Sequence, residues 1–166
     1  MRREGFTIIE LLLALVVISL VAALSIPAYF ARSEVTLENA AVLLARDLRS
    51  AQNRAAFRGR RTVVEMFPDR DGYQVLDQTG RPVTNPRTSE AFVRRYSIDG
   101  VFRGVEVLNV DFGGDRRLVY DENGQPGEAG EVTLGFDGDT RVVRVSAPGG
   151  RITILGTTSG WVDLGY

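Results

Sequence analysis

The chain has 166 residues, 44% of them hydrophobic and 25% charged, which leaves room for one modest globular domain beyond a long apolar N-terminal segment. Its formal net charge of -1 gives no overall attraction to nucleic acid or to an anionic surface. Cysteine, histidine and lysine are absent, which excludes disulfides, thiol nucleophiles, imidazole bases and Cys/His metal sites. We therefore expect no cofactor, no metal and no enzyme activity.

The N-terminal segment is a short basic leader followed by an apolar run. Arg2 and Arg3 precede the run, and residues 11–31 are apolar apart from two serines, Pro27 and a tyrosine. At about 1.5 Å of rise per residue this run reaches roughly 31 Å, which is enough to cross the hydrocarbon core of a bilayer. Because the arginines come first, we expect a single pass with the N-terminus in the cytoplasm and the rest of the chain outside the inner membrane.

The same segment resembles the class III signal segment of type IV pilins and type II secretion pseudopilins. The residues that carry the resemblance are the basic leader, Gly5, Phe6 and the carboxylate Glu10. It implies that a prepilin peptidase cuts between Gly5 and Phe6 and methylates the new N-terminus at Phe6. It also implies that Glu10 makes an assembly contact with an N-terminal amine, and that Pro27 kinks the helix. A proline inside a helix removes one hydrogen bond, so a kink or a local melt is expected at residues 23–27.

Glu10 has a second interpretation. Thr7 and Glu10 have the S/T-x-x-E spacing of a capping box, in which the glutamate satisfies backbone N–H groups at the start of its own helix. A carboxylate in the first turn also suits the helix dipole. The two roles are compatible, one before assembly and one after it.

A second helical segment is predicted to continue the first one. Apolar residues recur at steps of four and three along one stripe, namely Leu37, Ala41, Leu44, Leu48, Ala51 and Ala55. We expect this amphipathic helix over residues 32–58, ended by Arg58 and Gly59.

From residue 60 onward the sequence is typical of strands separated by Gly, Asp, Asn and Pro clusters. Strands are predicted at residues 62–67, 73–77, 92–97, 105–112, 117–121, 131–136, 141–146 and 151–155. Residues 79–90 and 122–130 are expected to be exposed loops, and residues 156–166 lie past the pattern, without an interpretation. The Asp-Gly pairs at 71–72 and 137–138 are interpreted as tight turns rather than calcium loops, which would need further oxygen ligands.

The order of these motifs is similar to that of the GspH/FimT group, minor pseudopilins of the H type and related minor pilins. The resemblance implies an α+β, pilin-like fold, with a long N-terminal helix packed on an antiparallel β-sandwich-like domain. The expected divisions are leader 1–5, membrane and assembly helix 6–31, amphipathic helix 32–58 and β domain 59–166. The implied role is that of a scarce structural subunit near the tip of the type II secretion pseudopilus. Its implied partners are other pseudopilins in a helical filament, the prepilin peptidase, inner-membrane lipid before assembly, and secreted protein cargo.

An arginine-rich stretch supports a second hypothesis, a minor type IV pilin that binds DNA for uptake or primes pilus assembly. Arginines that contact phosphates would give salt-sensitive binding. The stretch comprises Arg46, Arg49, Arg54, Arg58, Arg60 and Arg61, opposed by Asp47. DNA-binding relatives carry a Gly-Arg-x-Arg motif, and here Arg151 is followed by Ile152 and Thr153, so the second arginine is missing. We favour ordinary solvated arginines, or contacts to acidic neighbours in a filament, as the explanation of the stretch. A third hypothesis is a signal-anchored periplasmic domain with no filament role.

Overall fold

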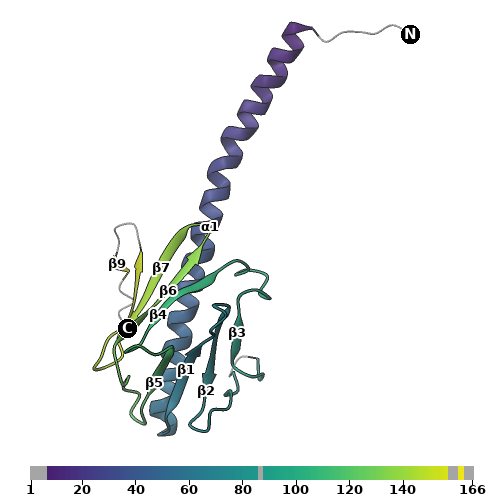
Figure 1. The fold of residues 1–166 in the computed structure, drawn as a ribbon. Helices are drawn as coiled ribbons and strands as arrows, with labels where there is room; N and C mark the ends of the chain where they lie inside the picture. The colour runs from purple at the N-terminus through teal and green to yellow at the C-terminus, as the bar shows by residue number, and fades with distance from the viewer. Residues whose placement is uncertain (1–6, 86–87, 157–160, 163–166) are drawn as a thin grey trace. The chain divides into compact units, whose positions relative to one another are not determined.

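The helix α1 (Ile8–Arg58) has 51 residues and is followed in the described chain by nine strands (Figure 1). The computed structural model describes residues 7–85, 88–156 and 161–162, with the side chains of residues 23–34 and 161–162 outside that description. The chain divides into two compact units, Met1–Val35 and Thr36–Tyr166. Helix α1 contributes to both units, and all the described strands belong to the second.

The start of α1 has the first half of the predicted capping box. The Thr7 carbonyl accepts hydrogen bonds from the N–H groups of Glu10 and Leu11 at 3.1 and 3.2 Å, and the Thr7 hydroxyl accepts from the Glu10 N–H at 3.4 Å. The hydroxyl thus satisfies a donor that has no partner inside the helix. Helix α1 continues without a break through Pro27, so the backbone has no local melt there, and the kink stays a prediction.

The other end of α1 is closed by a glycine. Gly59 has a φ of 57°, its N–H donates to the Ala56 carbonyl, and the Arg60 N–H donates to the Ala55 carbonyl at 3.2 Å. These two bonds form a Schellman motif, which requires a left-handed residue after the last helical turn. The predicted helix end at Arg58 and Gly59 is confirmed.

In the first unit, the apolar side chains of α1 from Ile8 to Ala22 are exposed. Within the part of the chain whose side chains are described, no helix is long and apolar enough to cross a membrane. The predicted membrane and assembly helix, residues 6–31, extends over residues 23–31, whose side chains lie outside that description.

The second unit contains two antiparallel sheets. The first has the order β3-β2-β1-β5 and the second has the order β4-β6-β7-β8-β9. Neighbouring strands pair in regular registers, such as Val64 with Val75 and Val132 with Val143. The strands are β1 (Thr62–Met66), β2 (Gly72–Leu76), β3 (Val93–Arg95), β4 (Glu106–Asp111), β5 (Arg117–Tyr120), β6 (Gly130–Phe136), β7 (Asp139–Val145), β8 (Ile152–Gly156) and β9 (Trp161–Val162).

The core of this unit lies between the sheets and the last part of α1. All six residues of the predicted apolar stripe are buried, with exposed fractions of 0 to 2%. They share one hydrophobic cluster with the inward side chains of both sheets, among them Val64, Tyr73, Val132 and Val143. The stripe prediction is confirmed, and the small alanines in it allow the strands to approach the helix closely. The α+β class and the antiparallel β domain are confirmed as well.

Several predicted bounds differ from the structure. Strand β3 is shorter than the predicted segment 92–97, and β9, which pairs with β8 through Trp161 and Leu155, was not predicted. The expectation that residues 79–90 form a wholly exposed loop is wrong, because Val83 is 5% exposed and its backbone bonds to Val75. Residues 122–130 are also not wholly exposed, since Gly124 and Pro126 are buried.

Candidate functional site

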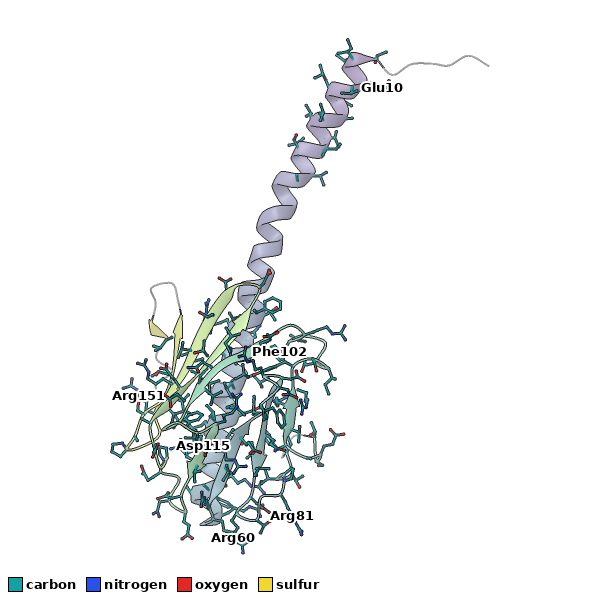
Figure 2. All side chains as sticks on the ribbon, viewed as in Figure 1. Glu10, Arg60, Arg81, Phe102, Asp115 and Arg151 are labelled. Carbon is teal, nitrogen blue, oxygen red and sulfur yellow. The ribbon has the colours of Figure 1, made fainter. Side chains whose placement is uncertain are left out.

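The exposed apolar face of α1 carries one carboxylate. Glu10 lies in the first turn of the helix, exposed and surrounded by exposed Ile8, Ile9 and Leu11 (Figure 2). Within the described residues its carboxylate has no hydrogen bond or ion pair, so the Glu10 half of the capping box is not formed. The predicted cleavage and methylation residues, Gly5 and Phe6, lie outside the described residues.

Four of the predicted arginines gather in one hollow at the C-terminal end of α1, which we call the arginine groove. Its volume is about 210 Å³, and it is lined by Arg54, Arg58, Arg60, Arg61, Thr62, Asp77, Gln78 and Thr79. Burial and the neighbouring Arg58 guanidinium lower the pKa of Arg54, while Asp77 acts in the opposite direction. Asp77 is the one carboxylate among these lining residues.

An aromatic side chain lies beside the arginine groove. Phe57 is 91% exposed and comes between Arg54 and Arg58 in the sequence. With Arg54, Phe57 also lines a neighbouring hollow of about 240 Å³ whose other walls include Val75, Val83 and Phe92. We call this hollow the apolar groove. A surface with four guanidiniums, an exposed ring and apolar walls can bind a partner that is both anionic and apolar.

The other arginines of the predicted patch lie apart from the groove. Arg46 is exposed on an earlier turn of α1, and Arg49 donates to the Gln52 side chain at 3.2 Å. Arg151 precedes β8, and Figure 2 shows it well separated from Arg60. Arg151, predicted as a possible DNA or partner contact, is therefore separate from the groove, and its role stays a prediction.

Asp47, counted in the sequence as part of the charged surface, is instead buried at 6% exposure. Its Oδ2 atom accepts a hydrogen bond from the Tyr73 hydroxyl and another from Nε of Arg94, each at 2.7 Å. Burial holds the pKa of the Tyr73 phenol well above its ordinary value, so the phenol stays a donor. Asp47 joins α1 to β2 and β3. The sequence feature that could have indicated this burial is the position of Asp47 three residues after Leu44, on the edge of the apolar stripe.

Two more polar side chains of α1 bind the β domain. Arg141, at the start of β7, donates from Nε to the Glu38 carboxylate at 3.0 Å. The Gln52 amide donates to the carbonyls of Gly124 and Gly149 at 3.0 and 3.1 Å. Neither contact was predicted, because each joins residues far apart in the sequence.

The acidic turn at residues 69–72 forms contacts within the protein. Asp69 and Asp71 both pair with Arg95, and Asp71 also accepts from the Ser97 hydroxyl at 2.6 Å. Within the described residues, no group of three or more acidic side chains could hold a metal ion.

A second acidic surface lies at the β6–β7 turn, and we call it the acidic end. It is a hollow of about 260 Å³ lined by Glu106, Asp137, Asp139 and Leu108 together with backbone and side-chain atoms of Gly104, Gly135, Phe136, Gly138 and Thr140. All three of its carboxylate residues are exposed. None of these carboxylates has a hydrogen bond or ion pair with another described residue.

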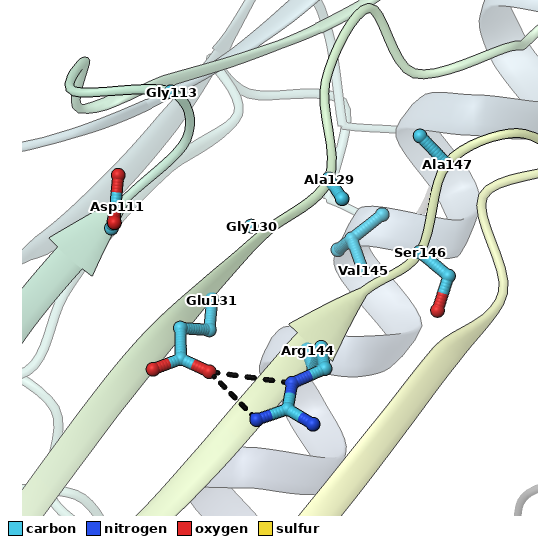
Figure 3. Close-up of a pocket in the computed structure, with 9 residues that line it drawn as sticks. All are labelled: Asp111, Gly113, Ala129, Gly130, Glu131, Arg144, Val145, Ser146 and Ala147. Atoms are coloured by element: carbon cyan, nitrogen blue, oxygen red, sulfur yellow. Dashed lines mark hydrogen bonds and ion pairs between the residues drawn. The ribbon is translucent and has the colours of Figure 1, made fainter.

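A larger hollow, of about 600 Å³, lies over β4, β6 and β7 (Figure 3). Arg144 donates to the Glu131 carboxylate from Nε and Nη2, at 3.3 and 3.1 Å, across the two strands. Asp111, at the rim, accepts a hydrogen bond from the Gly114 N–H at 2.9 Å. Because the charges of Arg144 and Glu131 neutralise each other, this hollow offers a ligand little unpaired charge.

Comparison with known proteins gives a consistent set of matches. The family model for the type II transport protein GspH matches residues 30–149, and the model for the prokaryotic N-terminal methylation motif matches residues 1–26. No curated protein sequence matches the chain.

Two crystal structures of the type IV minor pilin FimU from Pseudomonas aeruginosa are similar to this chain. The first has a TM-score of 0.50 and 19% identity, and the match covers 74% of this chain and 90% of that chain. The second, in another space group, has a TM-score of 0.49 and 18% identity, and covers 74% of this chain and 95% of that chain. Because only 19% of the residues are identical, the likeness to the first structure is evidence for the fold alone, which is pilin-like.

Proposed function

Because the chain belongs to the GspH family of type II transport proteins and carries the prokaryotic N-terminal methylation motif, we propose that it is a minor pseudopilin of the type II secretion pseudopilus. Proteins of the pilin and pseudopilin families are structural subunits, and the chain is not an enzyme. Its pilin-like fold suits assembly with other pilins in a filament.

The observation that carries the proposal is that the two parts of α1 differ in the burial of their apolar side chains. The helix buries its apolar residues between Leu37 and Ala55 in the core of the β domain, whereas those between Ile8 and Ala22 are exposed. Exposed apolar surface of this extent is covered by lipid or by protein in the functional state. A helix whose first part is left for lipid or other helices, and whose last part holds a globular domain, is what a membrane-inserted filament subunit needs.

In the proposed sequence of events, the apolar helix inserts in the inner membrane with residues 1–5 on the cytoplasmic side. The prepilin peptidase then removes residues 1–5 and methylates Phe6. Glu10 next pairs with the positive N-terminal amine of a neighbouring subunit, because opposite charges attract strongly where water is excluded. The helices form the filament core, and the β domain faces outward toward other minor subunits or secreted cargo.

Cleavage of the leader tests this proposal directly. We expect Gly5→Ala to leave the leader uncut, whereas the native chain coexpressed with a prepilin peptidase should lose residues 1–5 and gain one methyl group. The measurement is the intact mass of the purified full-length chain. Glu4→Ala is the matched control, since it changes the leader but keeps the cleavage residue, and it should still be cut. A native chain that keeps its leader in the presence of the peptidase would favour the signal-anchored domain instead.

A minor type IV pilin that binds DNA is the second candidate, and one observation favours it. The arginine groove combines four guanidiniums with the exposed Phe57 ring, and arginines beside an aromatic ring are the elements that bind single-stranded nucleic acid. Such binding would weaken steeply with salt. The incomplete motif at Arg151, which is also separated from the groove, counts against this candidate.

A further inference from the structure

The arginine groove and the apolar groove adjoin each other at the end of the β domain where α1 terminates. Arg54 lines both hollows, and its Nη1 donates to the Thr84 carbonyl at 3.5 Å, so its guanidinium lies at the border between them. From Leu37, where the core begins, to Arg58, α1 advances about 32 Å. The two grooves are therefore far from the point where α1 enters the domain, and Figure 2 shows Arg60 at this end of the domain.

Three guanidinium groups of the arginine groove are available to an outside acceptor. Within the described residues, those of Arg58, Arg60 and Arg61 have no hydrogen bond or ion pair. Asp77 lies beside them, but its Oδ1 already accepts from the Thr79 N–H and hydroxyl at 2.8 and 2.6 Å and from a further backbone N–H at 3.1 Å. The Thr79 hydroxyl also lowers the pKa of Asp77, so this carboxylate stays charged and bonded within its own turn. One carboxylate among four arginines leaves the groove positive, so it attracts an anionic partner.

The apolar groove adds a hydrophobic requirement to this charge. Its walls include Val75, Val83 and Phe92, which belong to the hydrophobic core, and the almost fully exposed ring of Phe57. An apolar side chain of a partner that enters this hollow would remove its own surface and that of Phe57 from water. Carboxylates form strong, often bidentate hydrogen bonds with guanidiniums. The two grooves together are therefore complementary to a segment in which carboxylates lie beside a large apolar residue.

This combination favours a protein over a nucleic acid. Phosphates would satisfy the arginines, but a nucleic acid has no aliphatic side chain to cover the walls at Val75 and Val83. Single-stranded nucleic acid binds where successive bases stack on aromatic side chains. Among the residues that line the two hollows, Phe57 is the one exposed aromatic ring, since Phe92 is only 4% exposed.

The same combination must be met by a chain other than this one. A contact between the grooves and a different surface of an identical copy would be heterologous, so it would repeat from copy to copy. A minor subunit, present in few copies, does not form such a repeat. Its partner at the grooves is therefore a different subunit, and the contact is made once for each copy of this chain.

We propose that the arginine groove and the apolar groove together bind an acidic, apolar segment of one different subunit of the same filament. The proposal rests on the filament role proposed above and names one contact within it. The arginines select the partner and its orientation, because charge complementarity acts mainly on specificity and on the rate of association. Since the grooves lie where α1 ends, the bound segment is displaced along the axis of α1 toward its C-terminus.

Photocrosslinking in membranes tests this contact with the full-length chain. The photoreactive residue p-benzoylphenylalanine replaces Gln78, an exposed residue of the arginine groove, and the other subunits of the filament are tagged one at a time. We expect irradiation to crosslink one tagged subunit, through a peptide that mass spectrometry shows to contain carboxylates beside a large apolar residue. A crosslinked peptide without carboxylates would contradict the proposal.

The same photoreactive residue at Val16, on the exposed apolar part of α1, reports whether the chain joins a filament at all. Crosslinks to other subunits through Val16 but none through Gln78 would contradict only the groove contact. Crosslinks through neither position would contradict the filament role itself.

Charge reversal separates a specific contact from random collision. Adding Arg58→Glu and Arg60→Glu should reduce the yield of the Gln78 crosslink about tenfold. Replacing two carboxylates of the crosslinked partner peptide with arginine should restore it, which also shows that the reversed chain is folded. The matched control, Arg46→Glu with Arg103→Glu, changes the net charge equally at exposed positions outside the groove and should leave the yield unchanged.

Several results would overturn the proposed partner. These are equal yields from the groove variant and its control, a loss that the arginines of the partner do not restore, and a product that nuclease treatment removes. Crosslinks that lead only to a second copy of this chain, or only to a secreted protein, would overturn it as well.

Discussion

Three polar residues on the packed side of α1, Glu38, Asp47 and Gln52, bind three different parts of the β domain. Apolar packing alone has little directional preference, so a smooth stripe of leucines and alanines would tolerate small slides and rotations of the helix. Hydrogen bonds to charged partners are directional and are costly to break when they are buried. The three contacts, spaced along α1, therefore define how far along the domain the helix lies and which face it presents.

Asp47 is the most sensitive of the three. Asp47→Ala removes the acceptor of both Tyr73 and Arg94 and leaves these donors at a buried position, so we expect a loss of about 3 kcal/mol in the free energy of unfolding. Urea unfolding of the full-length chain in detergent measures it. Arg46→Ala is the control, because this neighbouring side chain is exposed, and its effect should stay within about 0.5 kcal/mol. Similar losses for both variants would contradict the structural role of Asp47.

At the level of whole elements, the periodic parts of the sequence were predictable and the long-range contacts were not. The stripe along α1 repeats with the helical period, and the strands in the second sheet alternate apolar and polar residues, so both patterns are local. Strand β9 has two residues, and its place depends on pairing with β8. The burial of Asp47 depends on Arg94, 47 residues further along the chain.

The arginine groove was predictable only in part. Arg54, Arg58, Arg60 and Arg61 are close in sequence, at the end of a predicted helix, and the structure does bring them together. The opposite wall comes from the turn after β2, where Asp77 and two following residues lie against the arginines. No local pattern indicates that this turn meets the helix end, because the meeting follows from the pairing of β1 with β2. The acidic end depends in the same way on the pairing of β4 with β6.

The turn from α1 into β1 allows a prediction about a single glycine. Gly59 has a φ of 57°, and a Cβ atom built on it meets nothing within 4 Å. Gly59→Ala would therefore cause no clash, and its cost would come only from the left-handed backbone, about 1 kcal/mol of the free energy of unfolding. Thermal unfolding compared with Gly100→Ala checks this, since Gly100 has equally open space without a left-handed φ. We expect the control to change stability by less than about 0.5 kcal/mol. Equal effects at both sites would show that the Schellman motif does not stabilise this helix end.

At the scale of the whole molecule, the two units differ in what removes their apolar side chains from water. The hydrophobic core of the second unit begins at Leu37 and is closed by residues of α1 and the two sheets. The described residues of α1 before it, Ile8 to Ala22, contribute nothing to that core. Their apolar surface gains stability only when lipid or other helices remove it from water. Glu10 lies within this surface, and a carboxylate moved into an apolar environment requires a partner.

Two single changes separate the Glu10 carboxylate from the helix cap at Thr7. Glu10→Ala removes the carboxylate but keeps the Thr7 cap, so the chain should insert in the membrane normally while its recovery in sheared filaments falls strongly. Thr7→Ala removes the cap hydroxyl but keeps the carboxylate, and the loss of an N-cap costs about 1 kcal/mol of helix stability. Because lipid and neighbouring helices hold the segment after insertion, we expect Thr7→Ala to assemble almost as well as the native chain.

The measurement is the ratio of filament to membrane protein for each variant in cells that supply the remaining subunits. Normal assembly of Glu10→Ala together with a defect in Thr7→Ala would show that assembly depends on the Thr7 cap and not on the carboxylate, because a subunit that docks through its carboxylate must fail when that group is removed.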